Sequence, residues 1–533
     1  MRRVIAAAAA WVIGAVVLAP AQESAKTAPP TIAAAVAALG ADGVHTIRYS
    51  GFGSTYSVGQ SPAPGSPWPR VTLKKYEALV DYDAVAMQED YLREAGAIQP
   101  RGGGLPFTGE QRQLQMLRGT IAWNVPYGRP PRGRGPGPSE TPALPPTTPP
   151  APSPPFGGRG APPVPLAPQG AAASVTDRIQ QVWSTPHGFL KAAVANSATT
   201  VRGSDGVEVS FSAGGRRFRG VLNTRNEVER VRTWLDDPVL GDMLVESTFS
   251  GYEKFGVASF PTHIVERRGG FPVLDLFVGS VELNAKVDVT VPDSVRDQAL
   301  APTRVQVEKI GNGVYYLTGG SHHSVAIEMA DHVVLVEAPL NEERSIALLA
   351  AVTETLPAKP IRFVINTHHH FDHAGGLRTF VDAGATIVTH EMNKRFYETA
   401  WSAPRSINPD RLARSMKAPA FITFTDAYTL KDASRTLELH RLTGNPHNDG
   451  FVVVYLPGEK LLIEADAFTP ADGAPAPPAA PPGPPGFPAP VSPTTLNLYQ
   501  NIQRLKLDVA QIAALHGPRL AQMSELASAV GVN

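Results

Sequence analysis

The sequence predicts an α/β protein in which a β-rich N-terminal domain precedes a C-terminal domain of alternating strands and helices. At 533 residues the chain is too long for one ordinary domain. Apolar runs before residue 300 are mostly short and bounded by glycine, which is typical of strands. From Thr303 onward, strand-like runs alternate with helical patterns, which is typical of an α/β domain.

The N-terminal domain is expected to cover residues 31–125 and 171–300. Its predicted strands are 46–49, 70–73, 119–123, 207–211, 217–222 and 274–278. One helix is predicted at 187–196, whereas residues 76–93 are acidic and mixed and show no clear period. In strand order, and in stretches such as 226–252, this half resembles the curved antiparallel sheet of periplasmic lipoprotein-carrier proteins.

The C-terminal domain is expected to cover residues 303–533. Its predicted strands are 314–317, 324–329, 333–336, 361–366, 386–389, 451–456 and 461–465, and its predicted helices are 341–356, 376–383 and 496–507.

Two tracts contain a large share of the 52 prolines. Residues 126–170 and 474–490 cannot build a hydrogen-bonded ladder or bury a face, so both are expected to be extended or disordered. The first would be an insertion in the N-terminal domain, and the second an insertion in the C-terminal domain. A Pro-rich docking ligand is possible for either tract, but a tolerated surface insertion is favoured.

The first residues predict export. Arg2 and Arg3 precede an apolar run at 4–18, and Ala19-Pro20-Ala21 follows it. A charged start, a short apolar stretch and small residues at its end are typical of a signal peptide, here 1–21. A membrane anchor is the alternative, although the run is short for a membrane span. We therefore expect a periplasmic or secreted protein with no membrane span after cleavage.

Charge and cysteine content exclude several kinds of function. Lys plus Arg equals Asp plus Glu at 48 each, so no global field attracts nucleic acid, and a small-molecule substrate is expected. The chain has no cysteine, which excludes thiolate ligands, a cysteine nucleophile and disulfides. The oligomeric state is left open by the sequence.

The most informative segment is His368-His369-His370-Phe371-Asp372-His373. It follows the apolar run 361–365 and precedes Gly375 and Gly376, which places it in a tight turn between a strand and a helix. Histidine and carboxylate at this density predict metal ligands. For His369 alone, a polar surface residue is the alternative.

Four of these residues match a known signature. His368, His370, Asp372 and His373 fit His-x-His-x-Asp-His, so this half resembles the metallo-β-lactamase superfamily, in its glyoxalase II-like branch. The resemblance implies two sheets sandwiched between helices (αββα), with the ligands along one edge. Three further residues complete the family's ligand pattern in order, each at an end of a strand-like run: His447, which precedes the run 451–456, then Asp466 and His516.

This ligand set implies two metal sites. His368, His370 and His447 would hold one ion, Asp372, His373 and His516 would hold the other, and Asp466 would lie between them. Two ions about 3.5–4 Å apart can share a water, lower its pKa to about 7 and polarise the substrate oxygen. Two zinc ions are expected, with iron or manganese as alternatives. Asp372 is also expected to be catalytic.

Four further positions in this domain bear on the site without matching the ligand pattern. Where many family members have Asp-x-Gly, this chain has Glu337-Ala338-Pro339. His322 and His323 lie on an early hairpin and are either substrate contacts or part of a polar turn. A structural role is favoured for His390.

The function expected from these residues is hydrolysis of an ester, thioester, lactone or amide by metal-bound hydroxide. An iron-dependent, persulfide dioxygenase-like oxidation is one alternative. A ligand-binding envelope protein with a vestigial metal domain is another. We also expect the chain from Thr303 onward to hold its metals without the N-terminal half.

Overall fold

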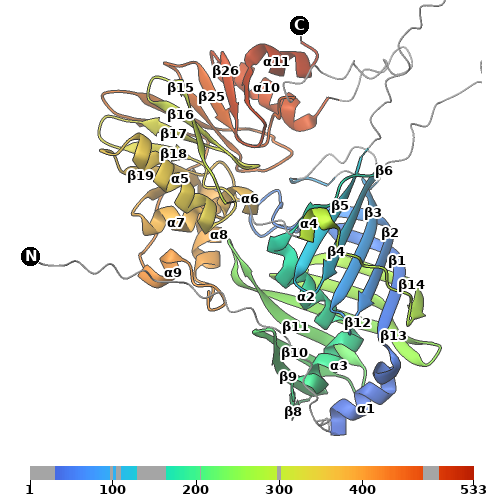
Figure 1. Ribbon diagram of the computed structural model, residues 1–533. Coiled ribbons are helices and arrows are strands. Elements are labelled where there is room, and N and C mark those ends of the chain that lie inside the picture. Colours follow the sequence, from blue (N-terminus) through green and yellow to red (C-terminus); the bar gives the residue numbers. More distant parts are fainter. Residues whose placement is uncertain are drawn as a thin grey trace, which may run out of the picture.

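The structure is a computed structural model that describes residues 30–96, 100–103, 110–128, 164–204, 206–296, 302–471 and 491–532 (Figure 1). The predicted signal peptide and most of both proline-rich tracts lie outside these residues. No helix in the described ranges is long and apolar enough to cross a bilayer.

The N-terminal region (residues 30–296) is built on one curved sheet of 14 strands, in the order β6-β5-β4-β3-β2-β1-β14-β13-β12-β11-β10-β9-β8, with β7 paired to β5. The strands are β1 (Thr46–Tyr56), β2 (Arg70–Asp81), β3 (Ala86–Glu94), β4 (Glu110–Arg118), β5 (Ile121–Gly128), β6 (Val164–Pro165), β7 (Gln169–Gly170), β8 (Thr199–Arg202), β9 (Val207–Ala213), β10 (Arg216–Leu222), β11 (Val228–Asp237), β12 (Gly241–Phe255), β13 (Ala258–Arg268) and β14 (Phe271–Leu283). The helices are α1 (Pro30–Leu39), α2 (Val175–Ser184), α3 (Pro186–Ala195) and α4 (Asp293–Arg296), with short 3-10 turns η1 (Ala41–Gly43) and η2 (Ala172–Ser174).

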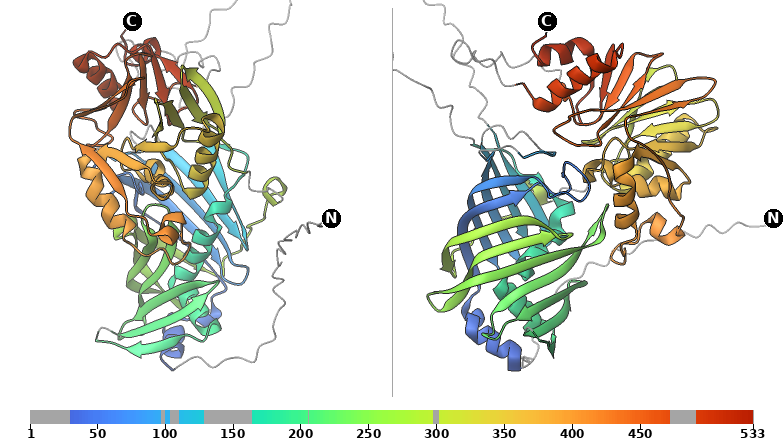
Figure 2. Two further views of the ribbon diagram at one scale, coloured as in Figure 1. Left: turned by 90° about the vertical axis from the view of Figure 1, so that its left-hand side faces the viewer. Right: turned by 180° about the vertical axis from the view of Figure 1, so that it is seen from behind.

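The sheet curls around α2 and α3, which cover its concave face (Figure 2). Along β12, Met243, Val245, Ser247 and Phe249 alternate as buried residues, because successive side chains of a strand point to opposite faces. Helix α3 confirms the helix predicted at 187–196. It begins at Pro186, and the Thr185 hydroxyl caps it by accepting from Gly188 N.

The segment without a clear period, 76–93, forms most of the antiparallel β2–β3 hairpin. Val85 occupies the turn with φ 47°, and Asp81 pairs with Ala86. The period of two is hidden because polar side chains such as Glu89 and Tyr91 line a cavity beside apolar ones. The structure also differs from the expected proline tract at both ends, since β5 continues to Gly128 and β6 and β7 pair with it.

The C-terminal domain (residues 302–532) contains two further sheets. The first comprises β15 (Gln306–Gly311), β16 (Val314–Thr318), β17 (Ser324–Glu328), β18 (Val333–Val336), β19 (Ile361–Ile365), β20 (Thr386–His390) and β21 (Ala420–Phe424). The second comprises β22 (Ala427–Lys431), β23 (Thr436–Arg441), β24 (Val452–Leu456), β25 (Leu461–Glu464), β26 (Gln511–Ala514) and β27 (Leu520–Gln522). The helices are α5 (Glu342–Thr355), α6 (Phe371–Ala374), α7 (Leu377–Asp382), α8 (Glu391–Trp401), α9 (Arg411–Ser415), α10 (Pro493–Leu505) and α11 (Met523–Ala529).

These elements form the predicted αββα arrangement of layers. Val336 and Ile365 of the first sheet pack against Val454 and Ile463 of the second in one apolar core. Helices α5 and α7 cover the outer face of the first sheet, and α10 and α11 cover that of the second. The mixed α/β class and the β-rich N-terminal half are therefore confirmed.

Among the described residues the two halves meet at three places (Figures 1 and 2). One is the segment before β4, where Arg101 donates to Asn445 O at 3.0 Å and Gly102 N donates to Pro446 O. At the second, the hairpin between β11 and β12 lies against Arg405, whose guanidinium donates to the carbonyls of Asp237 and Val239 at 3.2 and 3.0 Å. Asp242 accepts from Ser406 N at 2.9 Å. The third contact is the β1–β2 loop (residues 57–69), which reaches α6 and the turn before it.

Candidate metal centre

The motif follows β19, which is paired in parallel with β18 and β20, and runs into α6. His368, His370 and His373 are all buried. The glycine pair allows the following helix to approach closely. A Cβ on Gly375 would lie 1.9 Å from the carbonyl oxygen of Leu340, and one on Gly376 would lie 1.9 Å from Ser345 Oγ. The strand, the turn and the glycines together hold the histidines in a fixed place.

The structure gathers all seven predicted ligands into two groups. Within each group the candidate ligand atoms all lie within 4.8 Å of one another. The first group is His368, His370, His447 and Asp466, and the second is His322, Asp372, His373 and His516.

Asp466 lies between the two groups and presents one oxygen to each. Its Oδ2 lies 3.0 Å from His447 Nε2 and 3.7 Å from His368 Nε2. Its Oδ1 lies 3.0 Å from His373 Nε2 and 3.0 Å from His516 Nδ1. Such a carboxylate can be shared by two cations.

The residues fit divalent cations. His373 Nε2 and His322 Nε2 are buried, and neither makes a hydrogen bond of good geometry among the described residues, although a carboxylate oxygen lies 3.0 Å from the first and 3.3 Å from the second. Nitrogen lone pairs aimed at a common point with carboxylate oxygens are what a bound ion requires. Imidazole with carboxylate and no thiolate suits zinc, with iron and manganese also compatible.

Two imidazoles of the first group are held in the neutral form, which is the form that can bind a cation. Burial, reinforced by the neighbouring imidazoles, lowers the pKa of His368 and that of His370 well below the usual value. Both rings therefore remain unprotonated at neutral pH, which is the form that coordinates a metal.

The pKa of one histidine in the second group is raised, in contrast to those of His368 and His370. Burial acts against charge on His373, but Asp466 and Asp372 outweigh it and raise its pKa well above the usual value. Burial likewise acts against charge on Asp372, yet His373 and His322 hold the pKa of that carboxyl below its usual range. Metal binding here is expected to displace the proton of His373.

Glu337 stands where many family members have the aspartate of Asp-x-Gly. Its carboxylate contacts the Nδ1 side of the His373 ring. Its Oε2 lies 3.2 Å from His373 Nδ1, and its Oε1 accepts from Thr367 N at 2.6 Å. The residue is fully buried, and its backbone has φ 70°, an uncommon value for a residue with a side chain. A carboxylate behind a ligating histidine fixes the ring's orientation and its tautomer.

The β1–β2 loop of the N-terminal region also supports the centre, which the sequence did not predict. Ser61 O lies 2.8 Å from His370 Nε2, and the Gln60 amide donates to Asp372 Oδ1 at 2.8 Å. These residues are more than 300 positions from the motif, and residues 57–69 carry no recognisable signal. One ligand of the C-terminal half thus takes its orienting acceptor from the other half, and the expectation that the C-terminal half holds its metals alone stays a prediction.

Three of the histidines that the sequence analysis considered lie outside the two groups. His369 is buried rather than a surface residue, it contacts Asn448 through Nδ1 at 3.0 Å, and burial lowers its pKa to about 3. His390 caps α8 by accepting from Met392 N, in agreement with a structural role. His323 packs edge-on against Tyr316, and burial lowers its pKa.

A cleft of about 640 Å³ borders the second group. His516 and His323 contribute to its wall, together with Gly320, Thr469 and Arg519. The side chain of His516 is 45% exposed, whereas that of Asp466 is only 8% exposed. His516 is thus the ligand that is open to an incoming molecule.

Comparison with known proteins agrees with this geometry. Residues 317–510 match the family model of the metallo-beta-lactamase superfamily. The chain is also 24% identical over 164 residues to the 2,4-dinitroanisole O-demethylase subunit alpha of Nocardioides sp. (strain JS1661), a match that spans 30% of this chain and 45% of that relative.

Solved structures with a similar fold include two metallo-beta-lactamases. That of Pontibacter korlensis is 22% identical and covers 43% of this chain and 97% of its own, with a TM-score of 0.32. FIM-1 of Pseudomonas aeruginosa, in a mono-zinc form, is 18% identical and covers 42% of this chain and 93% of its own, also with a TM-score of 0.32. At these scores the two likenesses carry no argument of their own. The family match covers residues 317–510, so it identifies a metallo-β-lactamase superfamily domain in that part of the chain.

Proposed function

We propose that the protein is an exported dinuclear metallohydrolase that cleaves an ester, thioester, lactone or amide. The position of Asp466 carries the dinuclear part of the proposal. Its Oδ2 faces His447 and its Oδ1 faces His373, each at 3.0 Å. A single ion would use only one of these oxygens and would leave buried imidazoles of the other group without a partner.

The roles of the residues follow from their positions. Two bound zinc ions would supply the Lewis acidity that activates water near neutral pH and polarises the substrate oxygen. Asp372 keeps its negative charge because its pKa is held low, so its carboxylate can accept a hydrogen bond from the attacking water and orient it. Gln60 holds that carboxylate in place by donating to Oδ1. His516 would hold the second ion at the edge of the cleft, because its side chain forms part of the cleft wall.

His322 is assigned to the second metal rather than to the substrate. Its Nε2 lies 3.3 Å from Asp372 Oδ2, and its ring stacks on that of His516 with centroids 4.0 Å apart. The sequence left two interpretations open for His322 and His323, a substrate contact or a polar turn, and we therefore propose a metal role for His322 instead. His323 keeps the role of substrate contact, since it belongs to the wall of the cleft.

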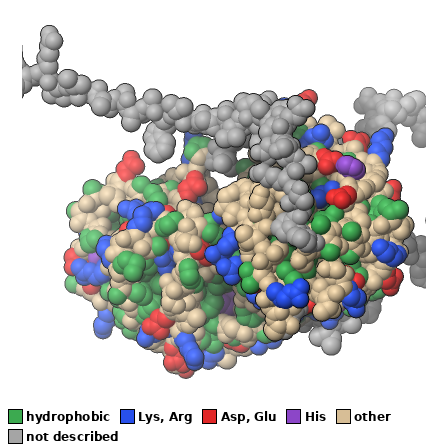
Figure 3. All heavy atoms as spheres, turned by 90° about the horizontal axis from the view of Figure 1, so that it is seen from below, with side chains coloured by type: hydrophobic (Ala, Val, Ile, Leu, Met, Phe, Trp, Pro, Cys, Tyr) green, Lys and Arg blue, Asp and Glu red, His purple; other side chains and the backbone are tan. Residues whose placement is uncertain are grey.

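The proposed substrate is a small molecule. The formal net charge is zero, and acidic and basic side chains are interspersed on the face seen in Figure 3. Such a surface offers no extended field for nucleic acid. The signal peptide predicted at residues 1–21 supports a periplasmic or secreted location.

A substrate panel tests this function. Zinc-loaded full-length protein would be assayed with esters, thioesters, lactones, β-lactams, amides and phosphodiesters. 2,4-Dinitroanisole belongs in the panel because a similar protein is named as its O-demethylase. We expect hydrolysis of one carbonyl class that stops when zinc is chelated. Oxygen consumption with a persulfide by the iron-loaded chain, without any hydrolysis, would instead support the oxidative alternative.

A further inference from the structure

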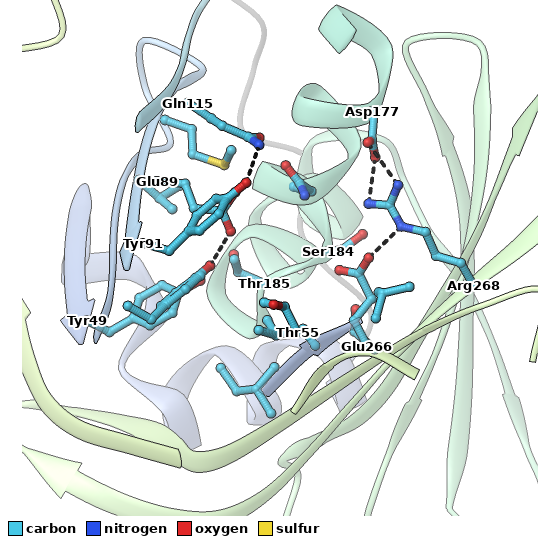
Figure 4. A pocket seen from close by; sticks show the side chains of 18 of the residues that line it. Tyr49, Thr55, Glu89, Tyr91, Gln115, Asp177, Ser184, Thr185, Glu266 and Arg268 are labelled. Atoms are coloured by element: carbon cyan, nitrogen blue, oxygen red, sulfur yellow. Dashed lines mark hydrogen bonds and ion pairs between the residues drawn. The ribbon is translucent and has the colours of Figure 1, made fainter. Parts of the chain in front are cut away.

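The arginines inside the fold differ in what their guanidinium groups contact. Arg268, at the wall of a cavity of about 260 Å³ in the N-terminal sheet, donates to the carboxylates of Asp177 and Glu266 (Figure 4). Arg344, on α5 of the C-terminal domain, is 2% exposed and has no carboxylate partner among the described residues. Burial lowers the pKa of Arg344, and no carboxylate offsets this effect. Its charge is therefore stabilised by neutral oxygens alone.

Four backbone carbonyls surround the Arg344 guanidinium. Nη1 donates to Arg304 O at 2.7 Å, and Nη2 donates to Thr318 O at 3.0 Å. Longer contacts join Nη2 to Leu317 O at 3.4 Å and to His322 O at 3.5 Å. Three of the four carbonyls belong to the end of β16 and to the loop that follows it. A guanidinium suits this arrangement because its donors lie in a fixed planar fork.

The β16–β17 loop (residues 319–323) lies directly on this guanidinium. A Cβ on Gly319, which has φ 95°, would lie 2.5 Å from Arg304 O, the carbonyl that accepts from Arg344. A Cβ on Gly320 would lie 3.7 Å from Arg344 Cζ. Two consecutive glycines restrain a backbone very little by themselves. The contacts with Arg344 therefore supply restraint that the loop sequence does not.

The same loop carries two histidines of the candidate site. His322 Nε2 lies 3.3 Å from Asp372 Oδ2, and its ring stacks on that of His516 with centroids 4.0 Å apart. The next residue, His323, donates through its backbone N to Leu515 O at 2.7 Å. The position of the loop thus decides where the His322 ring meets the second group.

Helix α5 gives the guanidinium a fixed base. Asn341 caps the helix by accepting from Arg344 N at 2.9 Å. Leu348 and Val352 of the same helix are buried in the apolar layer between α5 and the first sheet. Arg344 therefore joins the loop to a helix that is itself anchored on the sheet.

We propose that Arg344 is a positioning residue for the second metal group, which holds the β16–β17 loop so that His322 faces Asp372 and His516. The inference rests on the proposed assignment of His322 to the second metal. Lysine is not equivalent at this position, because an ammonium is a point donor and offers no planar fork to separate carbonyls.

Zinc affinity, measured without substrate, tests the proposal. Metal-free full-length protein, Arg344→Lys and Arg344→Met would each compete with a chelating dye for zinc. We expect one of the two ions to bind roughly tenfold or more weakly in both variants, as when a partner that orients a ligating histidine is lost. The ion held by His368, His370 and His447 should bind as before, since none of these histidines comes from the loop.

Arg178→Met is the matched control. Arg178 is buried and also donates to backbone carbonyls, those of Met116 and Trp123 at 2.7 and 2.8 Å, but it lies in the N-terminal region. Its replacement should leave the affinity for both ions unchanged. An equal loss of zinc affinity in Arg178→Met and Arg344→Met would reduce Arg344 to a general stabilising residue and overturn the proposal.

A double-mutant cycle with His322→Ala tests whether Arg344 acts through His322. In the His322→Ala background, Arg344→Lys should cause no further loss of zinc affinity. Additive losses would show that Arg344 affects the site by another route and would overturn the proposal. Circular dichroism verifies that each variant folds, and Arg344→Lys, which keeps the charge and a donor, decides the question if Arg344→Met does not fold.

The unmodified chain separates this inference from the proposed function. Two ions bound with equal affinity by the unmodified chain and by the Arg344 variants would overturn the inference alone. A single ion bound by the unmodified chain would overturn the dinuclear function and the inference together.

Discussion

Ser61 O, from the N-terminal region, lies 2.8 Å from His370 Nε2, in the metal motif of the C-terminal domain. Because a carbonyl only accepts, the proton of His370 must sit on Nε2, and Nδ1 is left free to face His368 Nε2 at 3.0 Å. The tautomer of one ligand is therefore set by the other half of the chain.

Truncation tests this relationship. A protein beginning at residue 302 lacks the Ser61 carbonyl and the Gln60 amide, so we expect its zinc affinity to fall roughly 10–100-fold, as when an orienting partner of a ligating histidine is removed. The measurement is competition with a chelating dye, with circular dichroism to verify that the truncated domain folds. Equal zinc affinity in the two proteins would show that the loop is a packing contact only.

Glu337 offers a second test of how the ligands are held. In Glu337→Gln, Oε1 can still accept from Thr367 N, but the carboxylate behind His373 is lost. We expect zinc affinity to fall roughly 10–100-fold with little change in fold. Glu328→Gln is the control and should leave zinc affinity unaltered. Glu328 lies on β17 of the same sheet, and its side chain is partly exposed.

Asp466→Ala tests the shared carboxylate. Without it, two cations would repel each other and four neighbouring imidazoles would lose a partner. We therefore expect loss of at least one ion and a decrease in kcat of roughly 10²-fold or more. Asp508→Ala is the control, because Asp508 is exposed and pairs only with Lys460 among the described residues. Full activity with both ions retained in Asp466→Ala would remove this residue from the mechanism.

Because of His187, which lies away from the metal centre, we expect the stability of the fold to depend on pH. His187 is fully buried, and burial lowers its pKa to about 4. In the unfolded chain this residue has a pKa near 6.5 and binds a proton below pH 6.5. In the folded chain it stays unprotonated until the pH approaches 4. The unfolding free energy should therefore fall by about 2 kcal/mol from this residue between pH 6.5 and pH 5.

Urea unfolding at pH 7 and pH 5 measures that effect. His187→Gln should reduce the difference in unfolding free energy between the two pH values by about the same 2 kcal/mol. His45→Gln should leave the difference unchanged, because His45 is largely exposed. An identical pH dependence in the unmodified chain and in His187→Gln would rule out this source.

The layers of the C-terminal domain could be predicted because its strands are continuous apolar runs. β24 and β25 are buried at every position, and α5 begins at an asparagine cap, so the sequence pattern and the structure agree. The ligand groups could be predicted for a related reason, since each predicted ligand lies near an end of a strand-like run, and these ends meet at one edge of the two sheets.

The rest of the site depends on contacts that have no local pattern. Gln60 and Ser61 reach the motif only through the packing of two halves of the chain, and His322 joins the second group through the hairpin between β16 and β17. The β2–β3 hairpin was missed because residues on its inner face, such as Glu89, line a cavity and are polar. Polarity on a concave face hides the alternation that marks a half-buried strand.

Zinc titration of the metal-free, full-length chain tests the dinuclear hydrolase most directly, with hydrolysis of the best substrate in the panel followed throughout. Since Asp466 faces one group with each oxygen, we expect activity to rise and to saturate at about two zinc ions per chain. Saturation at about one ion per chain, or no hydrolysis at any zinc loading, would contradict the account.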